Sequence, residues 1–450
     1  MATNAVNVSE IIDRRGFGSY QIWILGVCFL IALADGYDSQ SIGVTAPLIA
    51  GEFHLPPALL GPIFSSAQWG SLIGSLIFGP CADRWGRRRF LVACTLLFSL
   101  ATLATPFATS FETLAGIRFL TGLGLGGASP CFVALVAEYT PQRMRARIVE
   151  VLWGGLPGGG IFVGLLGAYL IADFGWRSVY WVGGVAGLLF VVLLVVRVPE
   201  SLRFMALRGG QEERMRRVLA RLAPGAVGPS VSRFVITEEA RAGMPVKHLF
   251  TGGRGLLTVL LWLLFFTAFG ALIASLVWIP TLLKQAGLTA PQAALCLALH
   301  NIGGVVGTVL SGVLIDRWGY VPLAFTFVLG TVSTALLGYA APDFLPVATV
   351  ATAAGFFLGG SASGIIVVAA QAYPTFVRST GVGWCQGFSR LGSAALPLLI
   401  GVLVAAHFTP AQNLAVLGAI PLISAVDLLA LHWLEKVRQA AAGPKAVAMP

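Results

Sequence analysis

The chain has 450 residues, of which 57 % are hydrophobic and only 11 % carry a formal charge. A soluble domain usually has about 25 % charged residues, so the composition excludes a water-soluble fold and indicates an integral membrane protein. The net charge of +10 does not indicate a nucleic-acid partner, because the basic residues are not gathered on a soluble module.

The N-terminal segment MATNAVNVSEIIDRRGFG lacks the apolar core and small-residue cleavage site of a signal peptide, so we expect none to be removed. The six cysteines lie in apolar runs without CxxC spacing. They are typical of small buried hydrophobic residues. We therefore expect no metal site and no disulfide framework.

Twelve segments are long and apolar enough to cross a bilayer, for which a helix needs about 20 mostly apolar residues. Their continuous apolar runs exclude a β-barrel, whose strands alternate in polarity. We predict an all-α membrane protein with twelve transmembrane helices. The segments lie near 20–50, 59–82, 89–108, 111–139, 146–172, 177–197, 254–283, 291–315, 320–340, 343–372, 378–406 and 411–435.

The positions of Lys and Arg predict that both termini are cytoplasmic. With that orientation, outside loops contain only Arg177 and Lys284, and only Arg118 and Arg390 lie within spans. All other basic residues fall in cytoplasmic loops and tails. The basic excess is therefore a signal of topology and identifies no ligand.

The long loop after the sixth span divides the chain into three parts. We predict an N-terminal six-helix bundle over 1–198, a cytoplasmic linker over 199–252, and a C-terminal six-helix bundle over 253–450. The linker sequence ESLRFMALRGGQEERMRRVLARL has apolar residues at helical spacing among charges. This pattern indicates an amphipathic helix on the membrane surface or against the bundle, although a plain connector fits as well.

The two halves match at a constant offset of 233 residues, which indicates an internal duplication. Parallel six-span repeats with a site at their interface are the construction of a secondary transporter. The matched positions are Gly70, Gly74, Gly79, Asp83, Arg84, Trp85 and Gly86 with Gly303, Gly307, Gly312, Asp316, Arg317, Trp318 and Gly319, then Gly126, Gly127, Pro141 and Arg145 with Gly359, Gly360, Pro374 and Arg378, and Pro47 with Pro280.

Between the second and third spans, GPCADRWGRRR resembles the signature loop of the major facilitator superfamily, Gly-x-x-x-Asp-Arg-x-Gly-Arg-Arg. GVLIDRWGYVP is a weaker copy between the eighth and ninth spans, and RFLTGLGLGG and PESLRF are also similar to that family. The resemblance covers essentially all twelve spans and implies a fold of two pseudo-symmetric six-helix bundles.

In that family the signature loop closes the cytoplasmic side, so we assign a cytoplasmic gate to this region. We expect Asp83 to cap a neighbouring helix N-terminus, where a negative charge is favourable, and Arg87 to pair with Glu138. Asp316, the repeat counterpart of Asp83, belongs to the same predicted gate. The alternative is that the arginines of this loop only enforce topology.

Ionisable residues within spans are costly and usually functional. Asp35 and Asp38 lie about halfway along the first span, and their spacing of three places them on one helix face. Because close carboxylates repel each other, this pair suits a reversible proton carrier. Gly36 and Pro47 permit local unwinding or bending of the span.

Arg390 lies roughly 18 Å into the eleventh span, counting 1.5 Å for each residue, near the depth of Asp35 and in the opposite half. A guanidinium suits bidentate capture of a carboxylate, so we predict a substrate-binding role for Arg390. The alternative is a permanent Asp–Arg pair that fixes the bundle.

Three further residues lie within spans, and Arg118 and His300 have two interpretations each. Arg118 couples protonation to the aspartates or braces its span through a carbonyl. His300 titrates near neutral pH or is a packing residue, and Asp427 is expected to be structural. Among the aromatic residues near the presumed cavity, Tyr37 and Trp384 are candidates to stack on a substrate ring.

The motif Asp35-Gly36-Tyr37-Asp38, with SLVWIPTLLKQAG and QGFSRLGSAALPLLIG, resembles the aromatic acid:proton symporters. The resemblance implies uptake of a benzoate- or hydroxybenzoate-like carboxylate with protons, without a cofactor, by a monomer in the bilayer of a bacterial inner membrane. Its two span-1 aspartates and its span-11 arginine correspond to Asp35, Asp38 and Arg390. With the other residues within spans, we predict a proton-coupling set of Asp35, Asp38, Arg118 and His300, and a substrate-binding set of Arg390, Asp35, Asp38, Tyr37 and Trp384.

Other substrates and other classes of protein are alternatives to this prediction. A muconate- or nicotinate-like anion stays an alternative, and so does a sugar, although a sugar site needs neutral hydrogen-bonding residues and no midplane arginine. GGLPGGGIFVG does not match the fifth-span pattern of drug antiporters. An enzyme or receptor would need a catalytic constellation or a sensory domain, and the sequence contains no such motif.

Overall fold

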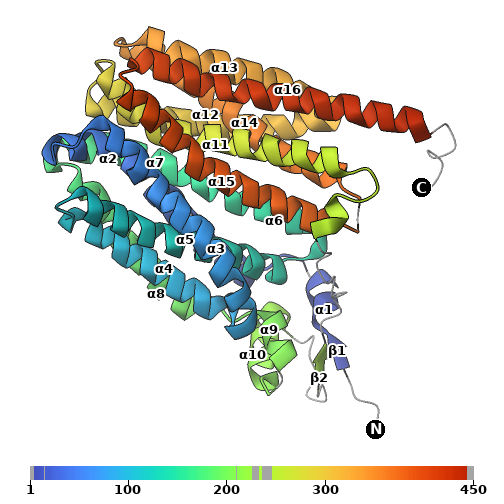
Figure 1. Cartoon of the computed structure of the whole chain (residues 1–450). Coiled ribbons are helices and arrows are strands. Elements are labelled where there is room, and N and C mark those ends of the chain that lie inside the picture. The colour runs from blue at the N-terminus through green and yellow to red at the C-terminus, as the bar shows by residue number, and fades with distance from the viewer. Residues whose placement is uncertain are drawn as a thin grey trace. The chain divides into compact units, whose positions relative to one another are not determined.

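The computed structural model describes residues 5–14, 16–208, 210–224, 233–235, 246–374 and 376–442. Within these ranges the chain is mainly α-helical (Figure 1). The helices of the first half and the linker are α1 (Val8–Arg14), α2 (Ser19–Glu52), α3 (Leu60–Trp85), α4 (Arg87–Ala104), α5 (Phe111–Tyr139), α6 (Gln142–Trp153), α7 (Gly155–Phe174), α8 (Arg177–Arg197), α9 (Leu202–Arg208) and α10 (Glu212–Leu222). Those of the second half are α11 (Gly255–Gln285), α12 (Ala290–Trp318), α13 (Pro322–Ala340), α14 (Phe344–Ala372), α15 (Arg378–Ala405) and α16 (Pro410–Ala442).

Long helices are what an apolar chain must form in lipid, because every backbone amide and carbonyl needs a partner within the segment. Two of them begin at a capping box. At the start of α5, the Thr113 amide donates to Ser110 Oγ over 3.3 Å, and the Ser110 amide donates to Thr113 Oγ1 over 3.1 Å. Thr289 and Gln292 form the same arrangement at the start of α12.

Eleven helical segments among the described residues are long and apolar enough to cross a membrane, with α6 and α7 counted as one. The predicted second span is present as the 26-residue helix α3 but is not among the eleven. Its Ser, Gln and Gly residues and its charged end make it less apolar than its neighbours. The chain is therefore a multi-span helical membrane protein, and the number twelve stays a prediction.

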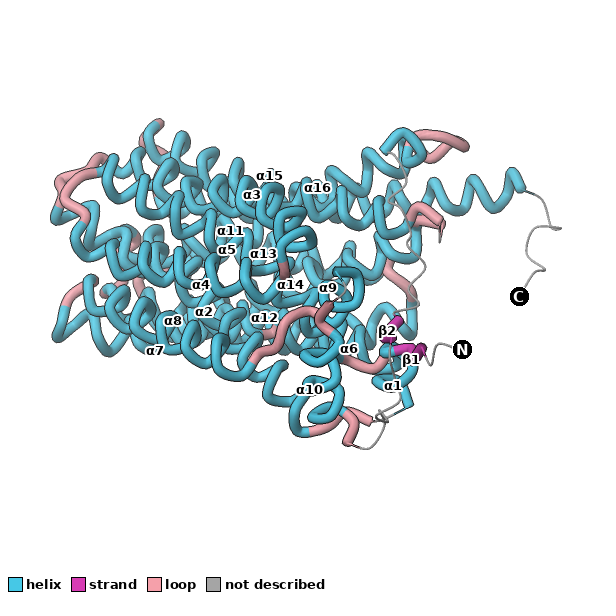
Figure 2. The backbone as a smooth tube through the Cα atoms, turned by 90° about the horizontal axis from the view of Figure 1, so that it is seen from below, coloured by secondary structure: helices cyan, strands magenta, loops and turns pink. Residues whose placement is uncertain are grey.

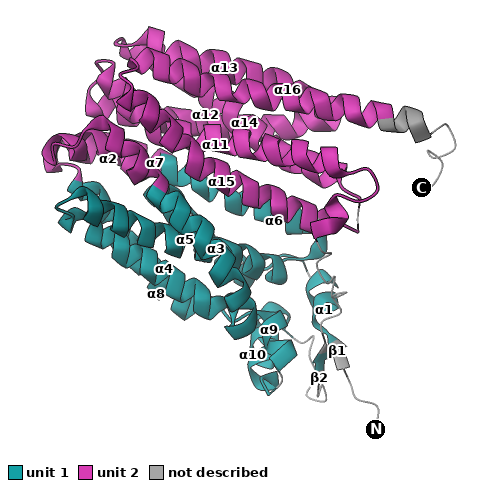
Figure 3. Ribbon diagram, viewed as in Figure 1, with its two compact units in different colours: residues 1–39, 66–160, 177–240 teal, residues 40–65, 161–176, 241–450 magenta. Residues whose placement is uncertain are grey.

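The chain forms two compact units (Figure 3). Unit 1 contains 1–39, 66–160 and 177–240, and unit 2 contains 40–65, 161–176 and 241–450. The boundaries fall inside α2, α3 and α7, so units defined by contact do not follow the sequence repeat. The predicted division at 198 and 253 rests on the repeat and stays a prediction.

In unit 1, glycines let α3 and α5 approach until their backbones touch. A Cβ atom on Gly122 would lie 1.9 Å from the Ala67 carbonyl oxygen, and one on Gly126 would lie 2.0 Å from that of Ser71. Either position therefore admits only glycine, as in close helix contacts within membranes.

Unit 2 repeats this contact between α12 and α14. A Cβ atom on Gly355, the repeat counterpart of Gly122, would lie 1.8 Å from the His300 carbonyl oxygen. One on Gly307 would lie 2.0 Å from the Phe356 carbonyl oxygen. The duplication seen in the sequence thus appears in the structure as the same glycine-mediated helix pair in each half.

Unit 2 also holds ends of α2, α3 and α7 from the first half, packed on helices of the second half. Gly43 of α2 lies against the Val277 backbone of α11, where a Cβ atom would be 2.9 Å from the Val277 Cα. Gly61 of α3 similarly faces Gly401 of α15, and Gly164 of α7 faces Ala294 of α12. We call the end of unit 2 that carries these contacts the closed end.

The described part of the linker contains two short helices, and the second of them, α10, has the apolar residues on one face that the sequence pattern predicts. α9 and α10 are separated near Gly210, whose φ of +66° is unfavourable for other residues. The apolar face of α10, with Met215 and Leu219, is buried in the core of unit 1 together with Val8 of α1. This face therefore packs against the helices of unit 1 and does not lie on the membrane surface.

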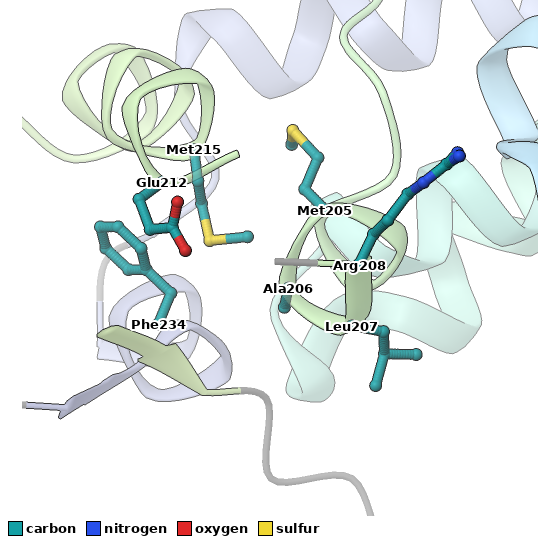
Figure 4. Close-up of a pocket in the computed structure, with 7 residues that line it drawn as sticks. All are labelled: Met205, Ala206, Leu207, Arg208, Glu212, Met215 and Phe234. Atoms are coloured by element: carbon teal, nitrogen blue, oxygen red, sulfur yellow. The ribbon is translucent and has the colours of Figure 1, made fainter. Parts of the chain in front are cut away.

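Two short parallel strands depart from the all-α prediction (Figure 2). β1 (Ala5–Asn7) pairs with β2 (Arg233–Val235), with Ala5 opposite Arg233. A pocket beside β2 is lined by residues of α9, α10 and β2 (Figure 4). Met205, Met215 and Phe234 supply its apolar surface, and Arg208 and Glu212 supply its charged groups. The pocket lies in the linker, away in sequence from the predicted site residues.

Candidate functional site

A buried ion pair joins α2 and α5 inside unit 1. Arg118 Nη1 lies 3.0 Å from Asp38 Oδ2, and the two side chains are 0 % and 3 % exposed. Arg118 Nη2 also donates to the Asp38 backbone carbonyl over 3.0 Å. Arg118 thus faces an aspartate, as the coupling interpretation requires, and also donates to a backbone carbonyl, as the bracing interpretation requires. Its role in proton coupling stays a prediction.

Thr102 of α4 also contacts Asp38, and sequence reasoning missed this residue. Its hydroxyl oxygen lies 2.6 Å from Asp38 Oδ1 and 2.8 Å from the Phe98 carbonyl oxygen. A hydroxyl group has one hydrogen to donate and can also accept. Thr102 can therefore donate to an ionised Asp38, or accept from a protonated Asp38 while donating to Phe98.

Asp35 lies one turn before Asp38 and is half-buried. Ser39 Oγ donates to Asp35 Oδ1 over 3.2 Å. The helix continues through Gly36, so the expectation of unwinding there is not met. Gly36 instead provides a close approach to α7, because a Cβ atom would lie 2.0 Å from the Leu156 carbonyl oxygen.

Tyr37 points toward α8 within unit 1. Its hydroxyl donates to the Val179 carbonyl over 2.9 Å, and its ring occupies the space beside Gly183. The side chain is buried. A ring contact with substrate at Tyr37 stays a prediction, and the contacts of Tyr37 with α8 give it a packing role.

The predicted residues of the second half lie in unit 2. Arg390 is half-buried on α15, and two residues later Gly392 packs on the Phe266 carbonyl of α11, which a Cβ atom would approach to 2.0 Å. Trp384, one and a half turns before Arg390, is 43 % exposed. Its ring centroid lies 5.7 Å from that of Trp262.

His300 and Asp427 are buried in unit 2. His300 lies on α12, where its backbone carbonyl meets Gly355 of α14. Asp427 lies on α16, one turn after Ser424, whose hydroxyl is 2.7 Å from that of Thr267 on α11. These positions suit packing between helices of one half, and the proton-coupling role of His300 stays a prediction.

The predicted contact between Arg87 and Glu138 is present in unit 1 as a short ion pair. Arg87 also lies 2.9 Å from Asp83. Glu138 accepts a second hydrogen bond from Ser201 Oγ over 2.6 Å. The pair therefore ties together the beginning of α4, the end of α5 and the beginning of the linker.

Glu200, and not Asp83, caps α4, the helix that follows the signature loop, and a cap by Asp83 on another neighbouring helix stays a prediction. Glu200 Oε1 accepts from the Arg88 amide over 2.9 Å in the first turn of α4. The side chain of Asp83 is 65 % exposed and faces Arg87. Gly86 between the helices has a φ of +112°, and this turn directs the first amides of α4 toward Glu200.

The second copy of the signature loop makes different contacts. Asp316 is exposed. The position equivalent to Arg87 is Tyr320, which donates to Glu435 Oε2 of α16 over 2.6 Å. The gate predicted from both copies therefore has an ion pair at Arg87 and a tyrosine hydrogen bond at its counterpart.

Among the residues that the structure describes, no group of three or more His, Cys, Asp and Glu residues is placed to hold a metal ion. Asp38 and Arg118 are charged groups of two membrane-spanning helices that the structure brings together in a buried pair. Long apolar helices, a glycine-packed repeat and a buried charge pair define the class of multi-span membrane transporters.

The chain belongs to the Major Facilitator Superfamily, whose family model matches residues 28–347 and 261–449. It is 36 % identical over 394 residues to the 4-hydroxybenzoate transporter PcaK of Pseudomonas aeruginosa, covering 87 % of this chain and 88 % of that one. It is 34 % identical over 429 residues to the gallate transporter of Pseudomonas putida, covering 94 % and 95 %. The family consists of transporters, so the chain is a transporter and not an enzyme.

Solved structures show the same fold. A D-xylose-proton symporter matches with a TM-score of 0.70 and 20 % identity, over 91 % of this chain and 97 % of that one. A bacterial homologue of the human lysosomal transporter Spinster, in an inward-facing and occupied conformation, matches with a TM-score of 0.73 and 17 % identity, over 93 % and 98 %.

The Glu200 cap leads to a testable difference between two acidic residues. Glu200→Ala should lower the free energy of unfolding by about 1 kcal/mol, as losing a helix cap usually does. Asp83→Ala should cost only about 0.3–0.5 kcal/mol, because it removes an exposed pair one turn apart. Thermal unfolding of the purified variants in detergent measures both, and equal losses would contradict the assignment of the cap.

Proposed function

We propose that the chain is a symporter that takes up an aromatic carboxylate, such as a hydroxybenzoate, together with protons by alternating access. The observation that carries the proton-coupling part is the buried Asp38–Arg118 pair with Thr102 beside it. The substrate class is supported by the relatives, which are named as 4-hydroxybenzoate and gallate transporters.

The proton step begins with Asp38 ionised and paired to Arg118. When a proton binds Asp38 Oδ1, the protonated carboxyl group donates a hydrogen bond to Thr102 Oγ1. The Thr102 hydroxyl then donates its own hydrogen to the Phe98 carbonyl 2.8 Å away. The attraction between Asp38 and Arg118 then loses its charge component, while Arg118 keeps its bond to the Asp38 carbonyl. Neither state leaves the Thr102 hydroxyl without a partner, so this hydroxyl opposes neither the binding nor the release of the proton.

The substrate step depends on a positive charge, that of Arg390, which attracts the negative carboxylate of the substrate. Arg390 binds the substrate carboxylate, and Trp384 and Tyr37 are the aromatic candidates to cover its ring. Because protonation of Asp35 or Asp38 removes repulsion against an anion, proton and substrate each strengthen the binding of the other. His300 and Arg118 complete the proposed proton-coupling set.

The gate and orientation follow from the same proposal. With both termini cytoplasmic and twelve spans, the cluster of Asp83, Arg87 and Glu138 faces the cytoplasm with Asp316, and the closed end of unit 2 faces outside. The bundles of 1–198 and 253–450 rock about the site, joined by the linker 199–252. We propose a monomer in a bacterial inner membrane that needs no cofactor, because the proton gradient supplies the energy.

Uptake of labelled 4-hydroxybenzoate by cells expressing the chain tests this function. An inward proton gradient should drive accumulation, and an uncoupler should abolish it, because Asp38 would no longer be loaded from outside. Unlabelled hydroxybenzoates should compete, whereas glucose should not. Equal uptake with and without the gradient would contradict proton coupling, and competition by glucose alone would point to a sugar carrier.

Arg390→Ala should reduce that uptake at least about tenfold, because losing a charged hydrogen-bond partner costs about 1.5–3 kcal/mol. Arg390→Lys is the matched control, since it keeps the charge without the bidentate geometry, and it should retain part of the uptake. Membrane abundance of each variant is measured alongside. Uptake by Arg390→Ala at the wild-type rate would refute the carboxylate site.

Thr102→Val should impair gradient-driven accumulation, because valine has the same shape but can neither donate to Asp38 nor accept its proton. We expect a shift in the pH dependence of uptake, since valine removes a partner from both states of the carboxyl group. Thr102→Ser keeps the hydroxyl and should behave as wild type. An unchanged pH profile in Thr102→Val would exclude a role for this hydroxyl in the proton step.

A further inference from the structure

A buried pair of amides follows the ion pair along α2. Gln40 lies two residues after Asp38, in unit 2, and Asn301 lies on α12 in the same unit. The two residues are 4 % and 3 % exposed. Asn301 Nδ2 donates to Gln40 Oε1 over 2.8 Å and to the Leu297 carbonyl over 2.9 Å. Both hydrogens of the Asn301 amide are therefore used.

This hydrogen bond joins the two halves of the repeat at the closed end. Around it the helices touch through small residues, because a Cβ atom on Gly43 would lie 2.9 Å from the Val277 Cα, and one on Gly164 would lie 2.7 Å from the Ala294 carbonyl. Such close packing excludes water, so an amide here must find its partner within the protein.

We propose that Gln40 and Asn301 form a latch that sets how easily the closed end opens during transport. This inference rests on the proposed alternating access, in which residues of the first half separate from those of the second half at this end. In the closed state Asn301 donates a hydrogen bond to Gln40, and in the open state water replaces this bond for both amides. The exchange is nearly balanced, since a hydrogen bond between neutral groups has a small net effect.

The balance explains why a polar pair suits this position. Two apolar side chains would gain by burial and would hold the end closed, because exposing them to water is unfavourable. A single amide facing an apolar residue would instead penalise the closed state, because the hydrogen bond between the two amides is lost there while the site stays dry. The latch lies on the same helix as Asp38, so any displacement of α2 that follows protonation acts on it directly.

Cysteine labelling of purified full-length protein in detergent tests the latch without any substrate. Val277 is 2 % exposed on α11, and its backbone meets Gly43 of α2 in the closed state. Val277→Cys therefore reports separation of these helices through its rate of reaction with a maleimide. Protein without this substitution gives the background from the six native cysteines.

In the Val277→Cys protein, Gln40→Leu alone and Asn301→Leu alone should each increase the labelling rate about tenfold, the expected effect of losing one buried hydrogen bond on one side only. The double substitution removes both amides and should return the rate to the wild-type value or below. The control is Thr267→Val with Ser424→Ala, which breaks a buried 2.7 Å bond between two helices of the second half. It should leave the rate unchanged.

Unchanged rates in both single variants would overturn the latch, and so would a double variant that labels faster than either single one. Should the leucine variants fail to elute as folded protein, Gln40→Asn, Asn301→Gln and their combination replace them. The double variant has the same total side-chain length as the wild-type pair, so it should label as slowly as the protein with the wild-type pair. Equal labelling rates in the two single variants and the double variant would overturn the latch. Labelling needs no substrate, so the two proposals can fail separately. If the variants label as predicted but the protein takes up no aromatic acid, the proposed aromatic-acid transport is rejected and the latch is retained.

Discussion

The ion pair between Asp38 and Arg118 is the contact on which the rest of the account depends. Both side chains are almost fully buried, and a buried charge without its partner would cost several kcal/mol. The pair is therefore stable only while α2 and α5 stay together and Asp38 stays ionised. Loss of the Asp38 charge weakens a contact between two helices, which is how one proton can change the conformation of a transporter.

The glycines make this arrangement possible by removing the space in which water would otherwise lie. Gly36 brings α2 against α7, and Gly122 brings α5 against α3. The same device recurs in the second half at Gly355. Charge in a dry site responds strongly to neighbouring groups, so the close packing and the proton chemistry are parts of one design.

The sequence predicts most of the helices and the charged half of the site, because apolar runs and rare charges are both visible in one dimension. α5 begins and ends where it was predicted, and Arg87 meets Glu138 as expected. Thr102 and the Gln40–Asn301 pair could not be predicted, since a threonine or amide within a span can equally bond to its own helix. Their partners lie 64 and 261 residues away, and no periodic pattern connects them. The cap of α4 by Glu200 could not be predicted for the same reason.

One measurement tests the central claim most directly: the pH change when 4-hydroxybenzoate is mixed with purified protein in weakly buffered detergent, followed with an indicator dye. If Asp38 takes up the coupled proton, wild-type protein should remove protons from solution as substrate binds. The variant Asp38→Asn with Arg118→Gln, which leaves no orphaned charge, should remove none. Equal proton uptake by the two proteins would show that the proton binds elsewhere and would contradict the account.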